Sequence, residues 1–425
     1  MSAASAGGES ISRVVITGMG AITPSGLDAE SLWDAASTGR SAITTLHGPE
    51  FDGLAVRIGG QVQGFATSLP TVLARRLSPV QQWAIAAADQ ALAQAGVVDG
   101  ALPWNPERVA VIAATGSGPV DAMQAATRAL DERGPRAVPL SLSMHGAPDA
   151  AAALISQQHR IFGPAQGVSA TCASGAIGLG EGLRRIRHGY ANAVVVVGME
   201  DCLNGVNLSS NANMRALASG YEADPTRASR PFDAGRTGFV MSQGAAAIVL
   251  ESAESARTRG AQVLAELSGF GASSDAYHPT APDPQGTGGA RAIRAALADA
   301  GIGQRDIEHI NAHSTGTVAG DAAELNAFDT ALGDRAHGIP ISATKSSTGH
   351  LLGASGVVEA IISVHTLRRG ILPPTINLDN PAFPEWNIVS APRQQRVHTV
   401  LSTSFGFGGH NGAVVLRTGE LHDRS

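Results

Sequence analysis

Short β-branched runs alternate along the chain with alanine- and leucine-rich stretches in which apolar residues recur at helical spacing. The runs lie at 13–17, 109–113, 194–197, 246–250, 264 onward, 309–311, 341–344 and 399–402. The run Val194 to Val197 is apolar at four consecutive positions, as expected of a strand that helices cover on both faces. Strands that alternate with helices predict an α/β protein with a large layered core.

Two segments far apart in the sequence look like versions of one unit. In the first, a strand ending at Cys172 turns into a helix; in the second, a strand ending at Lys345 leads through a glycine turn into another helix. The repetition indicates an internal duplication. We expect one half over 13–255, which carries Cys172, and the other over 260–419.

Composition excludes several classes of function. Only 16% of the residues are charged, and the net charge of −6 comes without a long run of either sign, so nucleic acid is not an expected partner. No apolar stretch approaches the roughly 18 residues of a membrane span, and the opening MSAASAGGES lacks the charged and apolar parts of a signal peptide. We therefore expect a cytoplasmic protein with no membrane partner.

Cys172 is the first candidate for chemistry. It stands at the N-terminus of a predicted helix with an apolar stripe, where unpaired N–H groups and the helix dipole favour a thiolate. A buried core cysteine explains this segment equally well. The only other cysteine is Cys202, and neither belongs to a C-x-x-C pair, which argues against a disulfide framework and a thiolate zinc site.

Two histidines and one lysine have unusual settings. His313 follows a predicted strand and precedes a polar, glycine-bearing loop, while His350 lies just ahead of a predicted helix, where an imidazole tends to stay neutral. Neutral imidazoles suit the stabilisation of an oxyanion or enolate, although a single histidine is more often structural. Lys345 is the only lysine among 30 basic residues, which suggests a tight site that demands a compact ammonium.

Glycines bracket Phe405 and Phe407 in a loop near the C-terminus, so the backbone can approach a ligand closely there. This loop lacks the Lys-Ser/Thr of a phosphate-binding loop and misses the last glycine of G-x-G-x-x-G. The chain also contains no G-x-S-x-G and no H-E-x-x-H, which argues against the common serine hydrolases and zinc enzymes. We expect no metal and no cofactor.

With these residues in this order, the chain resembles the elongating β-ketoacyl-acyl-carrier-protein synthases of the thiolase superfamily. The resemblance runs from about Arg13 to Arg417. Its supporting motifs are VITGMGAITP at 15–24, ASRPFD at 228–233, Asn311 to His313 with Thr315 and Thr317, KSSTGH at 345–350, PPTINL at 373–378 and FGFGG at 405–409.

The resemblance implies a five-layered αβαβα fold built from two duplicated halves and active as a dimer. Cys172 would take an acyl chain from a carrier-protein thioester. His313 and His350 would hold the malonyl thioester carbonyl while carbon dioxide leaves and the enolate attacks. The backbone N–H groups of Cys172 and Phe407 would form the oxyanion hole, and Phe407, beside Phe405, would gate the site.

The same resemblance implies supporting residues and a partner. Lys345 would pair with Glu324 and keep the histidine network ordered. An acidic acyl-carrier protein would dock on a basic rim, for which Arg75 and Arg76, at the start of a predicted helix, are candidates; an ordinary solvated pair is the alternative. The residue before the nucleophile is Thr171, where the family usually carries alanine or another small residue.

Several alternatives remain beside type II fatty-acid synthesis. A specialised ketosynthase of a type II polyketide or polyene pathway would share all these residues, and would work as a homodimer or as a heterodimer with a chain-length factor. A chain-length factor itself typically lacks the nucleophile, so Cys172 argues against it. A papain-like hydrolase needs its cysteine near the mature N-terminus. A thiolase needs a second cysteine late in the chain, and Cys202 lies too early.

The single lysine gives a first test. We expect Lys345→Arg to lower turnover several-fold, because a broad planar guanidinium does not fit where a compact ammonium is required. The measurement is steady-state chain extension by the purified variant beside the unaltered protein. Equal turnover would remove the argument from the single lysine.

Overall fold

Ten strands form one large mixed sheet in the structure, a computed structural model that describes residues 12–419. The first five are β1 (Val14–Ile22), β4 (Val109–Ala114), β5 (Ala165–Val168), β6 (Ala193–Glu200) and β7 (Gly244–Ser252). The other five are β8 (Ala265–Ser274), β9 (His309–Asn311), β10 (Ile341–Ser342), β13 (Thr399–Gly406) and β14 (His410–Arg417).

The two groups of five strands have the same topology. Their orders are β5-β4-β6-β7-β1 and β10-β9-β13-β14-β8. When the strands of each group are counted in chain order, the two orders are the same. The directions also agree: in each group the first three strands run parallel and the last two pair antiparallel. The groups meet where β1 pairs with β8. The α/β class and the duplication are confirmed.

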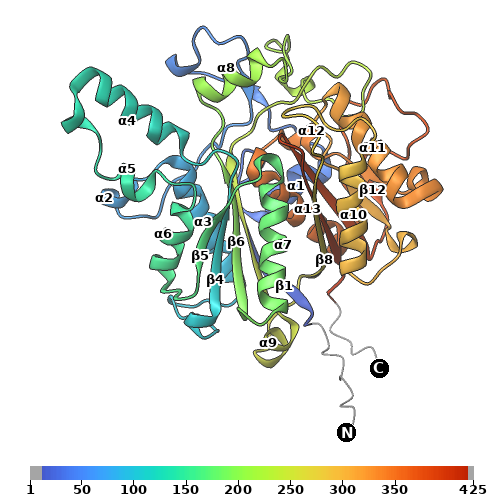
Figure 1. The fold of residues 1–425 in the computed structure, drawn as a ribbon, viewed down its shortest axis with the longest axis horizontal. Helices are drawn as coiled ribbons and strands as arrows, with labels where there is room; N and C mark the ends of the chain where they lie inside the picture. The colour runs from blue at the N-terminus through green and yellow to red at the C-terminus, as the bar shows by residue number, and fades with distance from the viewer. Residues whose placement is uncertain (1–11, 420–425) are drawn as a thin grey trace.

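Helices divide the molecule into layers (Figure 1). The outer face of the first strand group is covered by α3 (Pro79–Gln94) and α6 (Ala150–His159). That of the second is covered by α10 (Thr287–Asp299) and α11 (Val318–Leu332). The helices α7 (Ser174–Arg187) and α13 (Ser355–Arg369) lie between the two groups and contact both, which completes the αβαβα order.

The apolar run in β6 shows how the layers are built. Val194 and Val196 belong to the central core with α7 and α13, whereas Val195 and Val197 belong to the outer core with α3 and α6. Successive side chains of a strand point to opposite faces, so a strand covered on both sides must be apolar throughout.

Further helices and several short strands surround these layers. They are α1 (Ala29–Thr38), β2 (Thr44–Thr45), β3 (Ile58–Gly59), α2 (Thr71–Ala74), α4 (Val120–Arg133), α5 (Leu142–His145), α8 (Gly205–Asn213), α9 (Ala253–Thr258), α12 (Lys345–Thr348), β11 (Ile371–Leu372) and β12 (Arg393–Gln394). Figure 1 shows α4 and α5 projecting from the layered body. No helix within residues 12–419 is long and apolar enough to cross a membrane.

The central helices touch through their backbones. A Cβ added at Gly356 of α13 would lie 2.4 Å from the Ala176 nitrogen of α7, and one at Gly175 would lie 2.9 Å from the Val357 nitrogen. Only glycine allows this approach without a shift of one helix. The first turns of α7 and α13 are therefore held against each other.

This contact gives a stability prediction. Gly356→Ala should destabilise the fold by about 1–3 kcal/mol, because the added methyl group forces two packed backbones apart. Gly338→Ala is the matched control, since a Cβ there meets no atom within 4 Å. Chemical denaturation of both variants measures the difference. Equal midpoints for the two would show that the helices separate at little cost.

Candidate active site

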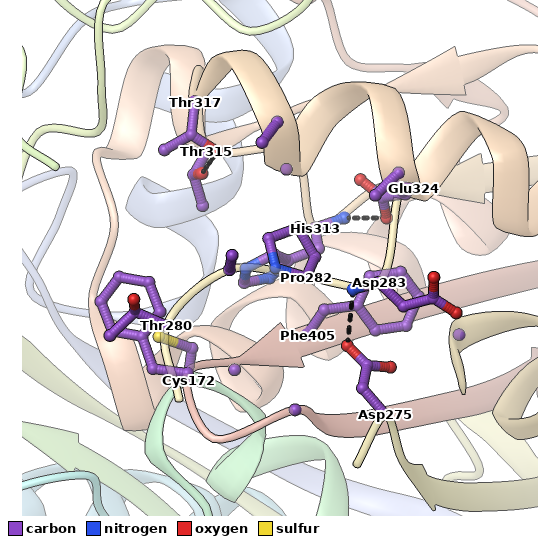
Figure 2. A pocket seen from close by; sticks show the side chains of 18 of the residues that line it. Cys172, Asp275, Thr280, Pro282, Asp283, His313, Thr315, Thr317, Glu324 and Phe405 are labelled. Carbon is purple, nitrogen blue, oxygen red and sulfur yellow. Dashed lines mark hydrogen bonds between the residues drawn. The ribbon is translucent and has the colours of Figure 1, made fainter. Parts of the chain in front are cut away.

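One cavity of about 330 Å³ gathers the residues singled out in the sequence (Figure 2). Its lining comes from both halves of the chain and includes Cys172, His313, Thr315, Thr317, Glu324, His350, Phe405 and Phe407. Among the described residues, no group of three or more histidine, cysteine, aspartate or glutamate side chains is placed to hold a metal ion.

Cys172 sits in a single helical turn, Thr171–Ala173, that leads directly into α7. Burial raises the pKa of its thiol to about 12, although the charge of Lys345 and a hydrogen bond from the Phe407 backbone N–H lower it. The expectation of a resting thiolate is therefore wrong. The helix N-terminus helps the anion, but it does not offset the loss of water around the sulfur.

The two histidines face each other inside the cavity. Their ring centroids are 5.3 Å apart and the rings are nearly perpendicular. Nδ1 of His350 lies 3.0 Å from the Ser355 hydroxyl, which fixes this ring at the start of α13. Nε2 of His350 and Nδ1 of His313 are buried, and within the described part of the chain no hydrogen-bond partner reaches either.

Both imidazoles are neutral, as the sequence predicts for His350. Burial lowers the pKa of His313 and of His350 well below the usual value, and the charge of Lys345 lowers each further. A neutral imidazole carries one N–H donor, so each ring can donate one hydrogen bond without a formal charge. The site therefore offers two hydrogen-bond donors without a positive charge on either ring.

Glu324 anchors the loop that carries His313. Its carboxylate accepts the backbone N–H groups of His313 and Ser314, both at 2.8 Å, and the hydroxyls of Ser314 and Thr403, both at 2.6 Å. Four donors occupy the two oxygens. Glu324 thus holds the loop by hydrogen bonds in a buried position.

Lys345 pairs with Glu359 of α13 and not with Glu324, which corrects the pairing implied by the resemblance. The lysine nitrogen contacts the Glu359 carboxylate, and both side chains are almost completely buried. Burial raises the pKa of Glu359 to about 7 even though the lysine lowers it. The Lys345 ammonium is buried, is paired with Glu359 and lowers the pKa values of two histidines. Such a position calls for a compact cation that is held in one place.

Glu359 is a residue that the sequence reading missed. The available signal was its position as the one acid in the stretch 355–367, which is mostly apolar and contains no other aspartate, glutamate, lysine or arginine. Charged side chains are seldom fully buried unless they are paired. A lone acid there, beside a lone lysine elsewhere, could have suggested this pair.

The remaining candidates occupy different positions. The hydroxyls of Thr315 and Thr317 lie 3.3 Å apart on one wall of the cavity, and the ring of Phe405 lies 6.1 Å from that of His313 (Figure 2). Arg75 and Arg76 are exposed at the end of α2, before α3 begins, so they are not at a helix start, and neither lines the cavity.

Comparison with known proteins decides the family. The family model described as "Beta-ketoacyl synthase, N-terminal domain" matches residues 12–256, and "Beta-ketoacyl synthase, C-terminal domain" matches residues 264–379. The chain belongs to the β-ketoacyl synthase family. This synthase is 39% identical to "3-oxoacyl-[acyl-carrier-protein] synthase 2" of Rhizobium meliloti (strain 1021), over 95% of this chain and 98% of the relative.

Solved structures of synthases share the fold over nearly the whole chain. A "Beta-ketoacyl synthase from Burkholderia phymatum STM815" superposes with a TM-score of 0.88 at 33% identity, covering 96% of this chain and all of that one. "The ishigamide ketosynthase/chain length factor" superposes with a TM-score of 0.88 at 31% identity, covering 97% of this chain and all of that one. The enzyme is thus an acyltransferase of the condensing type, with the thiolase-like fold.

The charge of Lys345 gives a pH prediction for this synthase. With both imidazole pKa values held far below 6.5, condensation from a preloaded acyl-Cys172 should stay level as pH falls from about 7.5 to 5.5. Lys345→Met removes the smaller of the two causes, so both pKa values rise while burial still holds them below 6.5, and any loss of rate should be confined to the acid end of that window.

The measurement is the single-turnover rate across this pH range. Lys345→Met with Glu359→Gln tests the same point in a neutral pair, whereas Lys345→Arg keeps the charge and should keep the level profile at a lower rate. A level profile in Lys345→Met would show that burial alone is enough to keep the imidazoles neutral.

Proposed function

We propose that the protein is a β-ketoacyl-acyl-carrier-protein synthase of type II fatty-acid synthesis. One observation carries the proposal: a buried cysteine that receives the Phe407 N–H shares a cavity with two neutral imidazoles whose free nitrogens are unpartnered. The cysteine supplies a nucleophile, the N–H groups receive an oxyanion, and the imidazoles receive a second carbonyl oxygen.

The first half-reaction transfers the acyl chain. The Cys172 sulfur attacks the thioester carbonyl, and the N–H groups of Cys172 and Phe407 stabilise the oxyanion. The carbonyl re-forms as the bond to the carrier sulfur breaks, and the thiol proton of Cys172 ends on the departing carrier thiol. Because the resting thiol is protonated, an imidazole nitrogen facing the cavity relays this proton.

The second half-reaction forms the carbon–carbon bond. His313 and His350 donate to the carbonyl oxygen of the malonyl thioester, and the electrons of the breaking bond to carbon dioxide move into an enolate. The enolate carbon attacks the acyl-Cys172 carbonyl, the carbonyl re-forms as the bond to the Cys172 sulfur breaks, and the sulfur takes up a proton from solvent. Neutral donors suit this step, because an imidazolium would protonate the enolate before it attacks.

The partner in both half-reactions is an acyl-carrier protein bearing its thioester on a phosphopantetheine arm. Thr315 and Thr317 place hydroxyls on the cavity wall, where they can bind the amides of such an arm. Arg75 and Arg76 remain candidates for docking because both are exposed and cationic. We expect a homodimer, supported by exposed apolar side chains on the projecting α4 and α5, Met123, Leu130 and Met144.

Two further points belong to the proposal. We place the division between the halves at 255–260, supported by the repetition of strand order on either side of that segment. We also place the enzyme in the cytoplasm, because Cys172 and Cys202 are both free and the chemistry requires a reduced Cys172.

A second candidate is a ketosynthase of a type II polyketide or polyene pathway, paired with a chain-length factor. It is favoured by the likeness to the ishigamide ketosynthase/chain length factor. The lining residues are common to both candidates, so the acyl chain accepted and the need for a second subunit distinguish them.

Intact mass spectrometry tests the function. The purified protein is offered saturated, unsaturated and β-keto acyl-carrier proteins and then malonyl-carrier protein. We expect the acyl mass to appear on the protein and to leave as an extended product. Cys172→Ala should show neither, while Cys202→Ala, the matched control, should show both.

The outcomes separate the candidates. Extension of saturated chains supports fatty-acid synthesis. Acylation confined to polyene or β-keto chains, or only with a second subunit, supports the specialised ketosynthase. Extension by Cys172→Ala would contradict the assignment of the nucleophile.

A further inference from the structure

Thr171, the residue before the nucleophile, has a strained backbone. Its φ is 49°, in the left-handed region, where a β-branched residue is rarely found. Such a conformation is energetically unfavourable and persists only where the surrounding structure maintains it. The resemblance to the family predicts alanine or another small residue here, so the threonine is a feature of this chain.

The Thr171 hydroxyl reaches the loop that carries Phe407. Its oxygen lies 2.8 Å from the Phe407 carbonyl oxygen and 2.8 Å from the Ala170 carbonyl oxygen. A hydroxyl has one proton, so it donates fully to one of these acceptors or is shared between them. The left-handed φ of Thr171 places the side chain where it can reach both.

The loop approaches Thr171 very closely. A Cβ added at Gly406 would lie 2.2 Å from the Thr171 hydroxyl oxygen and 3.0 Å from the Cys172 nitrogen. The Phe407 backbone is therefore held at two points. Its N–H is directed at the Cys172 sulfur, and its carbonyl accepts from Thr171.

We propose that Thr171 is a positioning residue for acyl transfer: its hydroxyl fixes the Phe407 carbonyl and so keeps the Phe407 N–H in place as an oxyanion donor. The inference rests on the proposed function, because it assumes that an oxyanion forms at Cys172. Donors that are already in place when charge develops contribute most to catalysis, so a loosened Phe407 slows the chemical step more than it weakens binding.

The Ala170 carbonyl oxygen, the second acceptor of the Thr171 hydroxyl, allows the hydroxyl to release Phe407 without losing its hydrogen bond. The resemblance to the family implies that the Phe407 loop gates the site; on such a movement the Thr171 hydroxyl keeps the Ala170 carbonyl as its acceptor, so no buried donor is left unpaired. Losing a buried hydrogen bond without replacement is destabilising, whereas exchanging one acceptor for another costs little. Thr171 thus favours the closed loop without preventing its opening.

The test is the single-turnover rate of acyl transfer to Cys172, followed by quenching and intact mass spectrometry at several carrier concentrations. Thr171→Val keeps the shape and removes the hydroxyl. We expect its limiting rate to fall about two- to tenfold, as one net hydrogen bond implies, with the half-saturating carrier concentration nearly unchanged. Thr171→Ser keeps the hydroxyl and should restore the rate to within about twofold.

Two further variants separate positioning from folding. Thr171→Gly relieves the strain while removing the hydroxyl, so it should be as stable as the unaltered protein, or more so, and still transfer the acyl group slowly. Thr171→Ala serves the same purpose if the valine variant does not fold, and it should be slow as well. A structural role alone would make the rate follow stability in all four variants.

Three results would overturn the proposal. They are a valine variant as fast as the unaltered protein, a serine variant as slow as the valine variant, and a glycine variant that is both stable and fast. If the unaltered protein is acylated normally, these results reject only the role of Thr171. If the unaltered protein takes no acyl group from any carrier, the proposed function fails and this inference fails with it.

Discussion

The contact between α7 and α13 is the constraint on which the site depends. Each helix follows the same strand in its own half of the fold, and glycines allow their first turns to touch. Cys172 lies directly before α7, and His350 lies shortly before α13. Any separation of the helices moves Cys172 away from His350, so the duplicated architecture also sets the geometry of the proposed active site.

Burial then determines the chemistry of each group. Removal from water keeps the Cys172 sulfur protonated and both imidazoles neutral, and Lys345 adds a fixed positive charge nearby. The charge is itself made tolerable by Glu359. The site holds no ionised thiol at rest, so in the proposed reaction the substrate enters before charge develops at the sulfur.

Much of this could be predicted from the sequence, and the failures have physical causes. The pattern of apolar residues predicts the layers. The four consecutive valines of β6, for example, require a strand that is covered on both faces. The predicted partner of Lys345 was wrong, because an ion pair between two helices depends on how the helices pack, and local sequence patterns do not reveal that packing. The prediction of a thiolate at Cys172 was wrong because the sequence reveals the helix N-terminus but does not reveal how deeply the sulfur is buried.

The protonated state of Cys172 has a consequence for the lifetime of the protein. Peroxide and other small oxidants attack thiolates far faster than thiols, and the first oxidation step leads toward irreversible acids. A sulfur whose pKa is raised to about 12 is almost entirely thiol near neutral pH. Between turnovers of the proposed reaction, then, the burial that calls for a proton relay in acyl transfer also protects the proposed nucleophile from oxidation.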